Sequence, residues 1–225
     1  MSSRHKPASL RRLAALGAAA LLSACSSDRG GGDWLAMVKA ARVAWDSRDA
    51  PVALDEAAAI PYATLGLRMD GGREQILLLA TDIGGERLWT SSAQVALTTR
   101  YGRIVRTAGF GTDLSGFVSR DSGREDWTKP HTYAWTADFA DLGLYSITIT
   151  CNVVPMGPDP ITILGKAFDT IRVDEACRSA KLDWSFNDSY WISAETGRVW
   201  RSRQHFHPKG PEVEIELLRP PLSAG

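Results

Sequence analysis

The sequence has little cysteine, little histidine and no apolar run long enough to cross a bilayer. Three cysteines and four histidines in 225 residues leave few ligands and few general bases, and no two cysteines follow the CxxC spacing of structural zinc sites. The one strongly apolar run, Leu13–Ala24, has 12 residues, whereas a bilayer core needs about 20 helical residues. The composition therefore excludes a cysteine-rich zinc module and predicts no lasting transmembrane helix.

The formal net charge is zero, but the charge is unevenly distributed. Residues 1–24 hold four basic side chains and no acidic one, which leaves 22 basic against 26 acidic side chains, a charge of about −4, in the rest of the chain. Such a body has no electrostatic basis for binding nucleic acid. With 44% hydrophobic and 23% charged residues the composition is globular and excludes disorder.

The first 24 residues have the pattern of an export signal. Basic Met1–Arg12 precedes the short apolar run Leu13–Ala24, which is typical of a secretory signal peptide. The run ends in Leu22-Ser23-Ala24-Cys25, which resembles the lipobox of bacterial lipoproteins and implies that the Cys25 thiol carries a diacylglycerol. The alternative is a plain secretory signal cut near Ala24, with Cys25 a bystander.

The residues after Cys25 bear on where the protein sits. Ser26 follows Cys25 directly. In enteric-type sorting an Asp at this position favours retention in the inner membrane, so a Ser here points to the outer membrane. Residues 25–32 form a Ser- and Gly-rich tether with a reach of roughly 15 Å. We therefore expect a single β-rich periplasmic domain over residues 33–225, anchored to the bilayer through acylated Cys25.

Two further thiols, Cys151 and Cys177, remain in the folded part. An exported protein meets oxidising conditions, so the pair predicts a disulfide. Two separately buried thiols are the alternative, since a free cysteine packs well in a core.

The folded part begins with one helical pattern and continues with strands. Apolar residues recur at helical spacing over Asp33–Trp45, with Asp33 placed to cap the helix. Short runs separated by turn residues then predict an antiparallel β-sandwich or barrel behind this one N-terminal amphipathic helix. Turns are expected at Tyr101-Gly102 and Glu195-Thr196-Gly197. The expected strands are Tyr62–Met69, Glu74–Thr81, Glu86–Thr90, Gln94–Arg100, Arg103–Ala108, Leu142–Val154, Ile161–Val173, Tyr190–Ala194, Val199–Phe206 and Glu212–Leu218.

Three stretches, together with the lipobox, carry a family resemblance. They are Ile60–Ala80, Leu88–Phe110 and Tyr190–Gln204, and the chain resembles the YjbF/GfcB family of bacterial lipoproteins, which is linked to exopolysaccharide and group 4 capsule production. The matching features are Pro61-Tyr62, Trp89 followed by Ser91, Gly102-Arg103, Thr196-Gly197 and Arg201-Ser202-Arg203-Gln204. The resemblance implies a periplasm-facing lipoprotein, largely of β structure, that acts with polysaccharide export proteins of the envelope. It brings no catalytic residues and no cofactor.

Two segments have partial catalytic or metal-binding patterns. Asp121-Ser122-Gly123 resembles the nucleophile segment of chymotrypsin-like proteases, whose histidine precedes the serine, but no histidine of the mature chain comes before His131. His205-x-His207 followed by Glu212 resembles the first metal motif of cupins, but only 18 residues follow His207, too few for the further histidine strand. We interpret the first as a turn and the second as a solvated strand face, so no metal is expected.

Aromatic and basic residues on the last strands give a candidate contact with glycan or partner. Trp200, Arg201 and Arg203 lie close in sequence, and aromatic rings stack on sugars while arginines pair with acidic ones. Strict alternation places Trp200 and Arg201 on opposite faces, which weakens a single patch. The sequence thus predicts a non-enzymatic outer-membrane lipoprotein that assists exopolysaccharide or capsule secretion through protein contacts or contacts with an acidic polymer. A glycan-binding module and a polysaccharide-modifying hydrolase are the alternatives.

Overall fold

The computed structural model describes residues 59–119 and 127–221. The signal peptide, Cys25, the tether, the helix expected over Asp33–Trp45 and the Asp121-Ser122-Gly123 segment lie outside the described residues. Within the described residues no helix is long and apolar enough to cross a membrane.

The described part of the chain is built almost entirely of strands, with one short 3-10 turn, η1 (Ala140–Leu142). The strands are β1 (Thr64–Met69), β2 (Gln75–Ile83), β3 (Glu86–Thr90), β4 (Ala96–Arg100), β5 (Arg103–Ala108), β6 (Gly116–Ser119), β7 (His131–Phe139), β8 (Leu144–Pro158), β9 (Ile161–Ile163), β10 (Lys166–Phe168), β11 (Thr170–Ser179), β12 (Trp184–Ser193), β13 (Val199–His205) and β14 (Glu212–Arg219).

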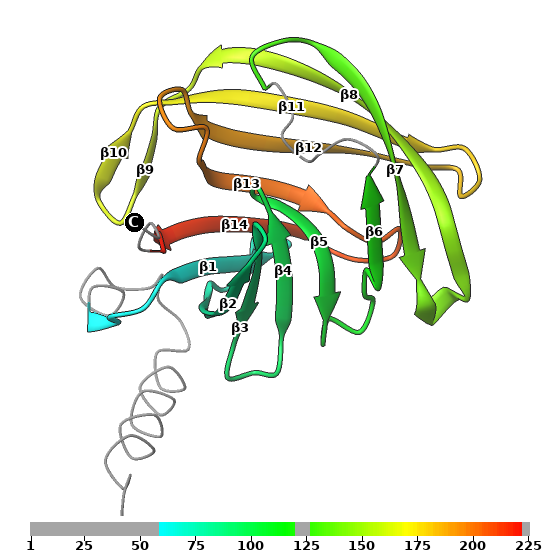
Figure 1. Ribbon diagram of the computed structural model, residues 1–225, viewed down its shortest axis with the longest axis horizontal. Helices are drawn as coiled ribbons and strands as arrows, with labels where there is room; N and C mark the ends of the chain where they lie inside the picture. Colours follow the sequence, from blue (N-terminus) through cyan, green and yellow to red (C-terminus); the bar gives the residue numbers. More distant parts are fainter. Residues whose placement is uncertain (1–58, 120–126, 222–225) are drawn as a thin grey trace, which may run out of the picture. The chain divides into compact units, whose positions relative to one another are not determined.

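Twelve of these strands form one antiparallel sheet in the order β5-β4-β3-β2-β1-β14-β13-β12-β11-β8-β7-β6 (Figure 1). Neighbours in the sheet are neighbours in sequence except at β1–β14, which joins the two ends of the fold, and at β8–β11. The hairpin β9–β10 is inserted between β8 and β11 and pairs only with itself. Two meanders, β1–β5 and β6–β14, are thus joined along their outermost strands.

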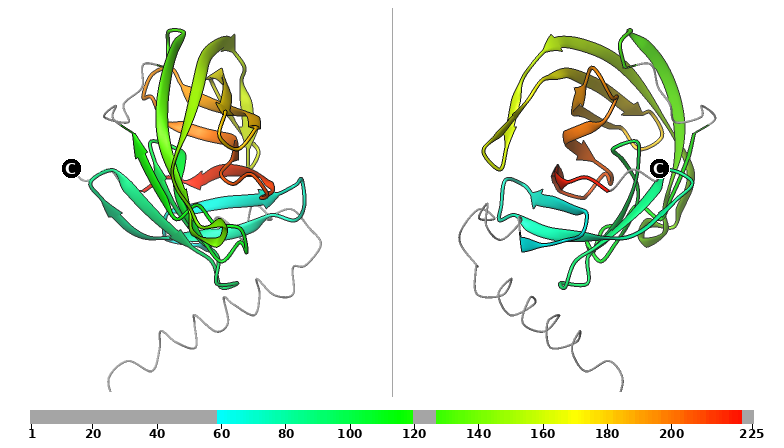
Figure 2. Two further views of the ribbon diagram at one scale, coloured as in Figure 1. Left: turned by 90° about the vertical axis from the view of Figure 1, so that its right-hand side faces the viewer. Right: turned by 60° about the vertical axis from the view of Figure 1, so that its left-hand side comes forward.

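The sheet curls until its two ends nearly meet (Figure 2). The Thr107 backbone N–H at the β5 end donates to the Leu114 carbonyl at 2.9 Å, and the Ser115 N–H donates to the Asp138 carbonyl of β7 at 2.9 Å. The chain between β5 and β6 therefore bridges the two edge strands. The predicted antiparallel, mainly β class is confirmed; of the two architectures left open, the single nearly closed sheet is the barrel-like one.

Alternation along the strands defines the inside of the curled sheet. In β7 the side chains of Tyr133, Trp135, Ala137 and Phe139 are buried, while the residues between them are exposed or half-buried. The same alternation holds for β8 and for the second half of β11. These strands therefore present one apolar row to the main core, as a strand with a period of two must when one face is solvated. Ile161, Ile163 and Trp191 form a second, smaller cluster.

Most of the expected strands are present, but one is divided, two were not expected and one begins earlier. Ile161–Val173 is not one strand: Leu164 (φ 48°) and Gly165 (φ 72°) form a tight turn that splits off the β9–β10 hairpin. Positive φ at both central positions gives a two-residue turn whose twist matches the flanking strands. Strands β6 and β7 were not expected, although the alternating residues of β7 carry the required signal, and β12 begins at Trp184 rather than at the expected Tyr190.

The turn expected at Tyr101-Gly102 is confirmed. Both residues have positive φ, 50° and 86°, and Arg100 pairs with Arg103 across the turn. A Cβ on Gly102 would lie 2.5 Å from Cβ of Val199. Only glycine fits here, because the β4–β5 turn packs directly on β13.

Candidate functional site

A buried ion pair crosses the interior of the sheet. The Arg103 guanidinium of β5 donates to both carboxylate oxygens of Glu175 on β11, at 2.8 and 2.5 Å, and Glu175 is fully buried. The Tyr133 hydroxyl donates to the same carboxylate at 3.2 Å, and Arg103 also donates to the Tyr190 hydroxyl at 3.0 Å. The guanidinium lies over the Tyr133 and Tyr190 rings, 5.2 Å from each centroid. Arg103, enclosed by aromatic rings, therefore satisfies the buried Glu175 carboxylate with two hydrogen bonds.

Gln204 of β13 extends this network to the β4–β5 turn. Its amide nitrogen donates to the Gly102 carbonyl at 2.8 Å and to the Ser202 hydroxyl at 2.7 Å, and its oxygen accepts from the Ile104 backbone N–H at 2.9 Å. Strands of the two meanders are therefore linked inside the sheet, at residues 102 positions apart in sequence.

A second buried carboxylate, Asp188 of β12, is paired with a histidine. It accepts from the His205 backbone N–H at 2.9 Å and lies 3.1 Å from His205 Nδ1. Burial raises the pKa of Asp188 to about 6, against the opposing effect of the hydrogen bond from His205. The same hydrogen bond raises the pKa of the His205 imidazole despite its partial burial.

The residues of the cupin-like pattern do not converge. His205 and Glu212 are partners in the β13–β14 register, but His205 is turned to Asp188. His207 is buried against the Phe139 ring, 5.0 Å between centroids, with Nε2 3.2 Å from a carboxylate oxygen of Asp141. The pattern is therefore divided between two separate side-chain pairs.

Cys151 and Cys177 are directly opposite each other on β8 and β11 and form a disulfide with an S–S distance of 2.04 Å. Their sulfurs and a Glu175 oxygen lie within 4.8 Å of one another, the arrangement within residues 59–119 and 127–221 closest to a metal-binding group. Both sulfurs are consumed by the disulfide and Glu175 is held by Arg103. This group is therefore a structural part of the core.

On the outer face, Arg201 and Arg203 are paired with carboxylates of the neighbouring strand. Arg201 donates to Glu216 at 2.7 Å and Arg203 to Glu214 at 2.8 Å. Burial acts to raise the pKa of Glu214, but the hydrogen bonds and charges of Arg203, Arg68 and Arg201 together outweigh it and the pKa is lowered. Both guanidinium groups also lie within 6 Å of the Trp191 ring centroid. Arg203 is thus part of an ion-pair row along β13 and β14.

Trp200 lies apart from Arg203 because β13 is irregular at this point. Trp191 pairs with Arg201 and Ile192 with Val199, so Trp200 is the extra residue of a bulge. Its ring packs on Phe168 of the β9–β10 hairpin, 4.1 Å between centroids, and the Arg198 guanidinium lies 5.3 Å from its centroid. The predicted cluster is therefore divided, and Trp200 has Arg198 as its basic neighbour.

The structure has a pocket of about 570 Å³ beside Trp200. It is bounded by β1, β3, β4, β13, β14 and the β4–β5 and β12–β13 turns, and both Trp200 and Arg201 line it. Sequence reasoning missed its other principal residues, Arg198 and Tyr101 on the turns and Trp127. We refer to it as the arginine-aromatic pocket.

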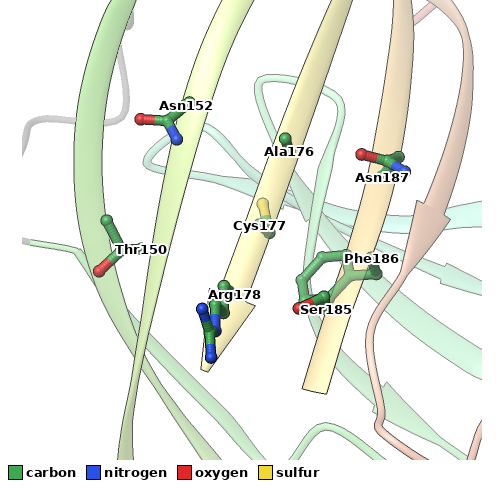
Figure 3. Close-up of a pocket in the computed structure, with 8 residues that line it drawn as sticks. All are labelled: Thr150, Asn152, Ala176, Cys177, Arg178, Ser185, Phe186 and Asn187. Atoms are coloured by element: carbon green, nitrogen blue, oxygen red, sulfur yellow. The ribbon is translucent and has the colours of Figure 1, made fainter. Parts of the chain in front are cut away.

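A second hollow, about 440 Å³, lies on the outer face of β8, β11 and β12. Figure 3 shows Thr150, Asn152, Arg178, Ser185 and Asn187 along its floor and sides, all of them exposed. It lacks the aromatic walls of the arginine-aromatic pocket, apart from Phe186, and is the weaker candidate.

Comparison with known proteins assigns the chain to a family. The model of the family described as "Group 4 capsule polysaccharide lipoprotein gfcB, YjbF" matches residues 37–218. The chain belongs to this family. The resemblance seen in the sequence is confirmed, and the match also covers the segment 111–176 between the stretches that carried it.

The chain is similar to two lipoproteins of Escherichia coli K12. It is 25% identical over 181 residues to "Uncharacterized lipoprotein GfcB", covering 78% of this chain and 85% of that protein. It is 27% identical over 181 residues to "Uncharacterized lipoprotein YjbF", covering 73% and 79%. The crystal structure of the hypothetical lipoprotein YmcC from the same organism shares the fold, with a TM-score of 0.67 and 22% identity over 88% of this chain and all of that one.

Most of the features that carry the family resemblance meet at one place in the structure. Trp89 and Gly102 come from the stretch Leu88–Phe110, Thr196-Gly197 and Arg201-Ser202 come from Tyr190–Gln204, and all of them line the arginine-aromatic pocket. Arg103 and Gln204, from the same stretches, form the network beneath it. The family features and the arginine-aromatic pocket therefore coincide.

Proposed function

We propose that this protein is a non-catalytic lipoprotein of the outer membrane that assists secretion or assembly of a capsule or exopolysaccharide. Acylated Cys25 would anchor it, and the β domain would work in the periplasm with polysaccharide export proteins. The observation that carries the proposal is membership, over residues 37–218, of a family described as capsule polysaccharide lipoproteins. The lipobox-like Leu22-Ser23-Ala24-Cys25 supports the anchor.

The state of the buried titratable groups supports a non-catalytic role. Glu175 is held by Arg103, Asp188 by His205, and His207 by Asp141. A general acid or base must come within hydrogen-bond reach of the substrate, whereas Glu175, Asp188 and His207 are at most 3% exposed. A hydrolytic role would have to use side chains other than these three pairs.

Deleting the gene and measuring surface polysaccharide tests the proposal. We expect less exported polymer, restored by the wild-type gene and not by Cys25→Ser, which removes the acceptor thiol. Ser26→Ala, one residue away, is the matched control and should restore export. Normal polymer in the deletion strain would contradict the role in secretion, and full rescue by Cys25→Ser would contradict the anchor.

The non-catalytic part has its own measurement. The purified protein, incubated with the polymer of its own cell, should leave the polymer's size distribution unchanged in gel filtration. Shortened chains, lost on substitution of a single carboxylate, would establish the hydrolase alternative instead.

A further inference from the structure

Among the described residues, the charged side chains that line the arginine-aromatic pocket are all arginines, namely Arg87, Arg198 and Arg201. Arg87 is paired with Asp82 at 2.9 Å and Arg201 with Glu216 at 2.7 Å. Arg198 has no carboxylate partner among the described residues, and its guanidinium faces the Trp200 ring. The pocket therefore holds a half-buried positive charge available to an anion.

The rest of the wall suits a flat, partly apolar ring. Tyr101 is 45% exposed at the rim, and Trp127 and Trp200 are half-buried within it. The hydroxyls of Thr196 and Ser202 and the glycines 102 and 197 add polar groups and room beside these rings. Aromatic faces flanked by hydroxyls and a charged donor are the usual means of holding a hydroxylated ring that carries a charge.

The pocket is also held in shape from below. Gly102 packs against Val199, and its carbonyl accepts from Gln204, which fixes the β4–β5 turn that carries Tyr101. On the opposite side the Gly197 N–H donates to the Ser193 carbonyl at 2.9 Å, which fixes the turn that carries Arg198. A volume of about 570 Å³ falls in the range of small-ligand sites, about 300–1,000 Å³.

We propose that the arginine-aromatic pocket binds an acidic segment of the exported polysaccharide, with Arg198, positioned by the Trp200 ring, pairing with a sugar carboxylate and Tyr101 packing on a sugar ring. This inference rests on the proposed function, since it takes the ligand from the polymer that the protein assists. It adds the ligand class and the residues that recognise it.

The test uses the full-length protein in neutral detergent and fragments of the polymer from its own cell, separated by anion exchange into acidic and neutral fractions. Isothermal titration calorimetry should show binding of the acidic fraction. Carboxyl-reduced acidic fragments, which keep their rings but lose the charge, should bind at least about tenfold more weakly.

Variants locate the site. Arg198→Gln should weaken binding of the acidic fraction about tenfold or more, as loss of a charged hydrogen bond does, and Tyr101→Ala about three- to tenfold, as loss of ring packing does. Arg178→Gln, which makes the same charge change in the outer hollow of Figure 3, is the matched control and should bind as the wild type does.

Each other outcome overturns the proposal. Absence of binding to any acidic fraction, equal binding of the carboxyl-reduced fragments, or equal effects of Arg198→Gln and Arg178→Gln would exclude this site. If no binding at the pocket is found but the deletion strain exports less polymer, the proposed function is kept and the pocket proposal is rejected. Binding here with normal export in the deletion strain would reject the proposed function instead.

Discussion

The interior and the outer face of the sheet both pair arginine with glutamate, yet the two kinds of pair differ in what they hold together. Inside, Arg103 and Glu175 are nearly or fully buried and 72 residues apart in sequence, on the two meanders. Outside, Arg203 and Glu214 are 11 residues apart on adjacent strands, and the Arg203 side chain is 52% exposed.

The comparison shows that burial decides how much an arginine–glutamate pair contributes to the stability of the fold. Water and salt screen the outer pair, so it adds little to the hydrogen bonds that already join β13 and β14. The inner pair has no water to replace a lost partner, so removing one member leaves a charge buried. The interior pair is thus expected to hold the two meanders together, and the outer pairs to tune the surface.

Arg103→Ala tests the interior pair and should have the largest effect. We expect the free energy of unfolding to fall by about 3–5 kcal/mol, because Glu175 is left buried and unpaired. Urea unfolding followed by fluorescence measures it. The double variant Arg103→Met/Glu175→Leu should recover part of the loss; if it is worse than Arg103→Ala, an unpaired charge is not the cause.

Cys151→Ala/Cys177→Ala tests a second interior link, the disulfide that joins β8 to β11. The closed loop spans a sequence separation of 26, for which chain entropy predicts a loss of roughly 3.5 kcal/mol in the free energy of unfolding. Unfolding in urea, compared with the wild type under non-reducing conditions, measures it. Cys25 is unchanged in this variant, so membrane anchoring is not affected by the substitutions. An unchanged urea midpoint of unfolding would mean that Cys151 and Cys177 are reduced in the cell.

Asp188→Asn tests how the interior responds to pH. Since burial raises the pKa of Asp188 to about 6, the folded protein keeps a proton between about pH 4 and 6 that the unfolded chain has released. The stabilisation that comes from protonated Asp188 is therefore lost as pH rises through its folded pKa of about 6. The raised pKa of His205 acts in the same direction, because its contribution is complete below the unfolded pKa and disappears as pH rises through the folded one.

The stability of the wild type relative to Asp188→Asn should therefore decline from pH 4 to pH 8, by on the order of 2 kcal/mol. Urea unfolding of both proteins at intervals of one pH unit gives the difference directly. A difference that stays level with pH, or rises, would show that Asp188 is not protonated in the fold near pH 5.

Arg203→Gln tests the outer face and should have the smallest effect, less than about 1 kcal/mol in the free energy of unfolding and smaller still at high salt. Thermal unfolding at low and high salt measures it. A loss as large as that of Arg103→Ala would remove the distinction between the two faces.

Sequence reasoning succeeded where the signal is local. The alternation of Val213, Ile215 and Leu217 with glutamates placed β14 with its apolar side inward, as the structure has it. The glycine of the Tyr101-Gly102 turn marked the β4–β5 hairpin. Strand β7 was missed although its alternation is as regular, because the turn-rich segment before it obscured where it begins.

The candidate site was only partly accessible from sequence. Trp200 and Arg201 were identified and do line the pocket, but their partners Arg198 and Tyr101 lie on turns that approach each other only when the β1–β5 meander joins β13 and β14. A charged residue within a strand, such as Arg103 or Glu175, reads as solvent-facing when only its own strand is considered.

Local chemistry along the chain determined the alternating strands and their hairpin turns, since each depends on residues a few positions apart, and the ordered set of short motifs determined the family. Closure of one curled sheet decided the rest: which charges are buried, which aromatic rings share a pocket and which arginine of that pocket has no carboxylate partner among the described residues. Those properties arise from side chains brought together across many tens of residues, because a strand carries no record of the strand it will face across a core.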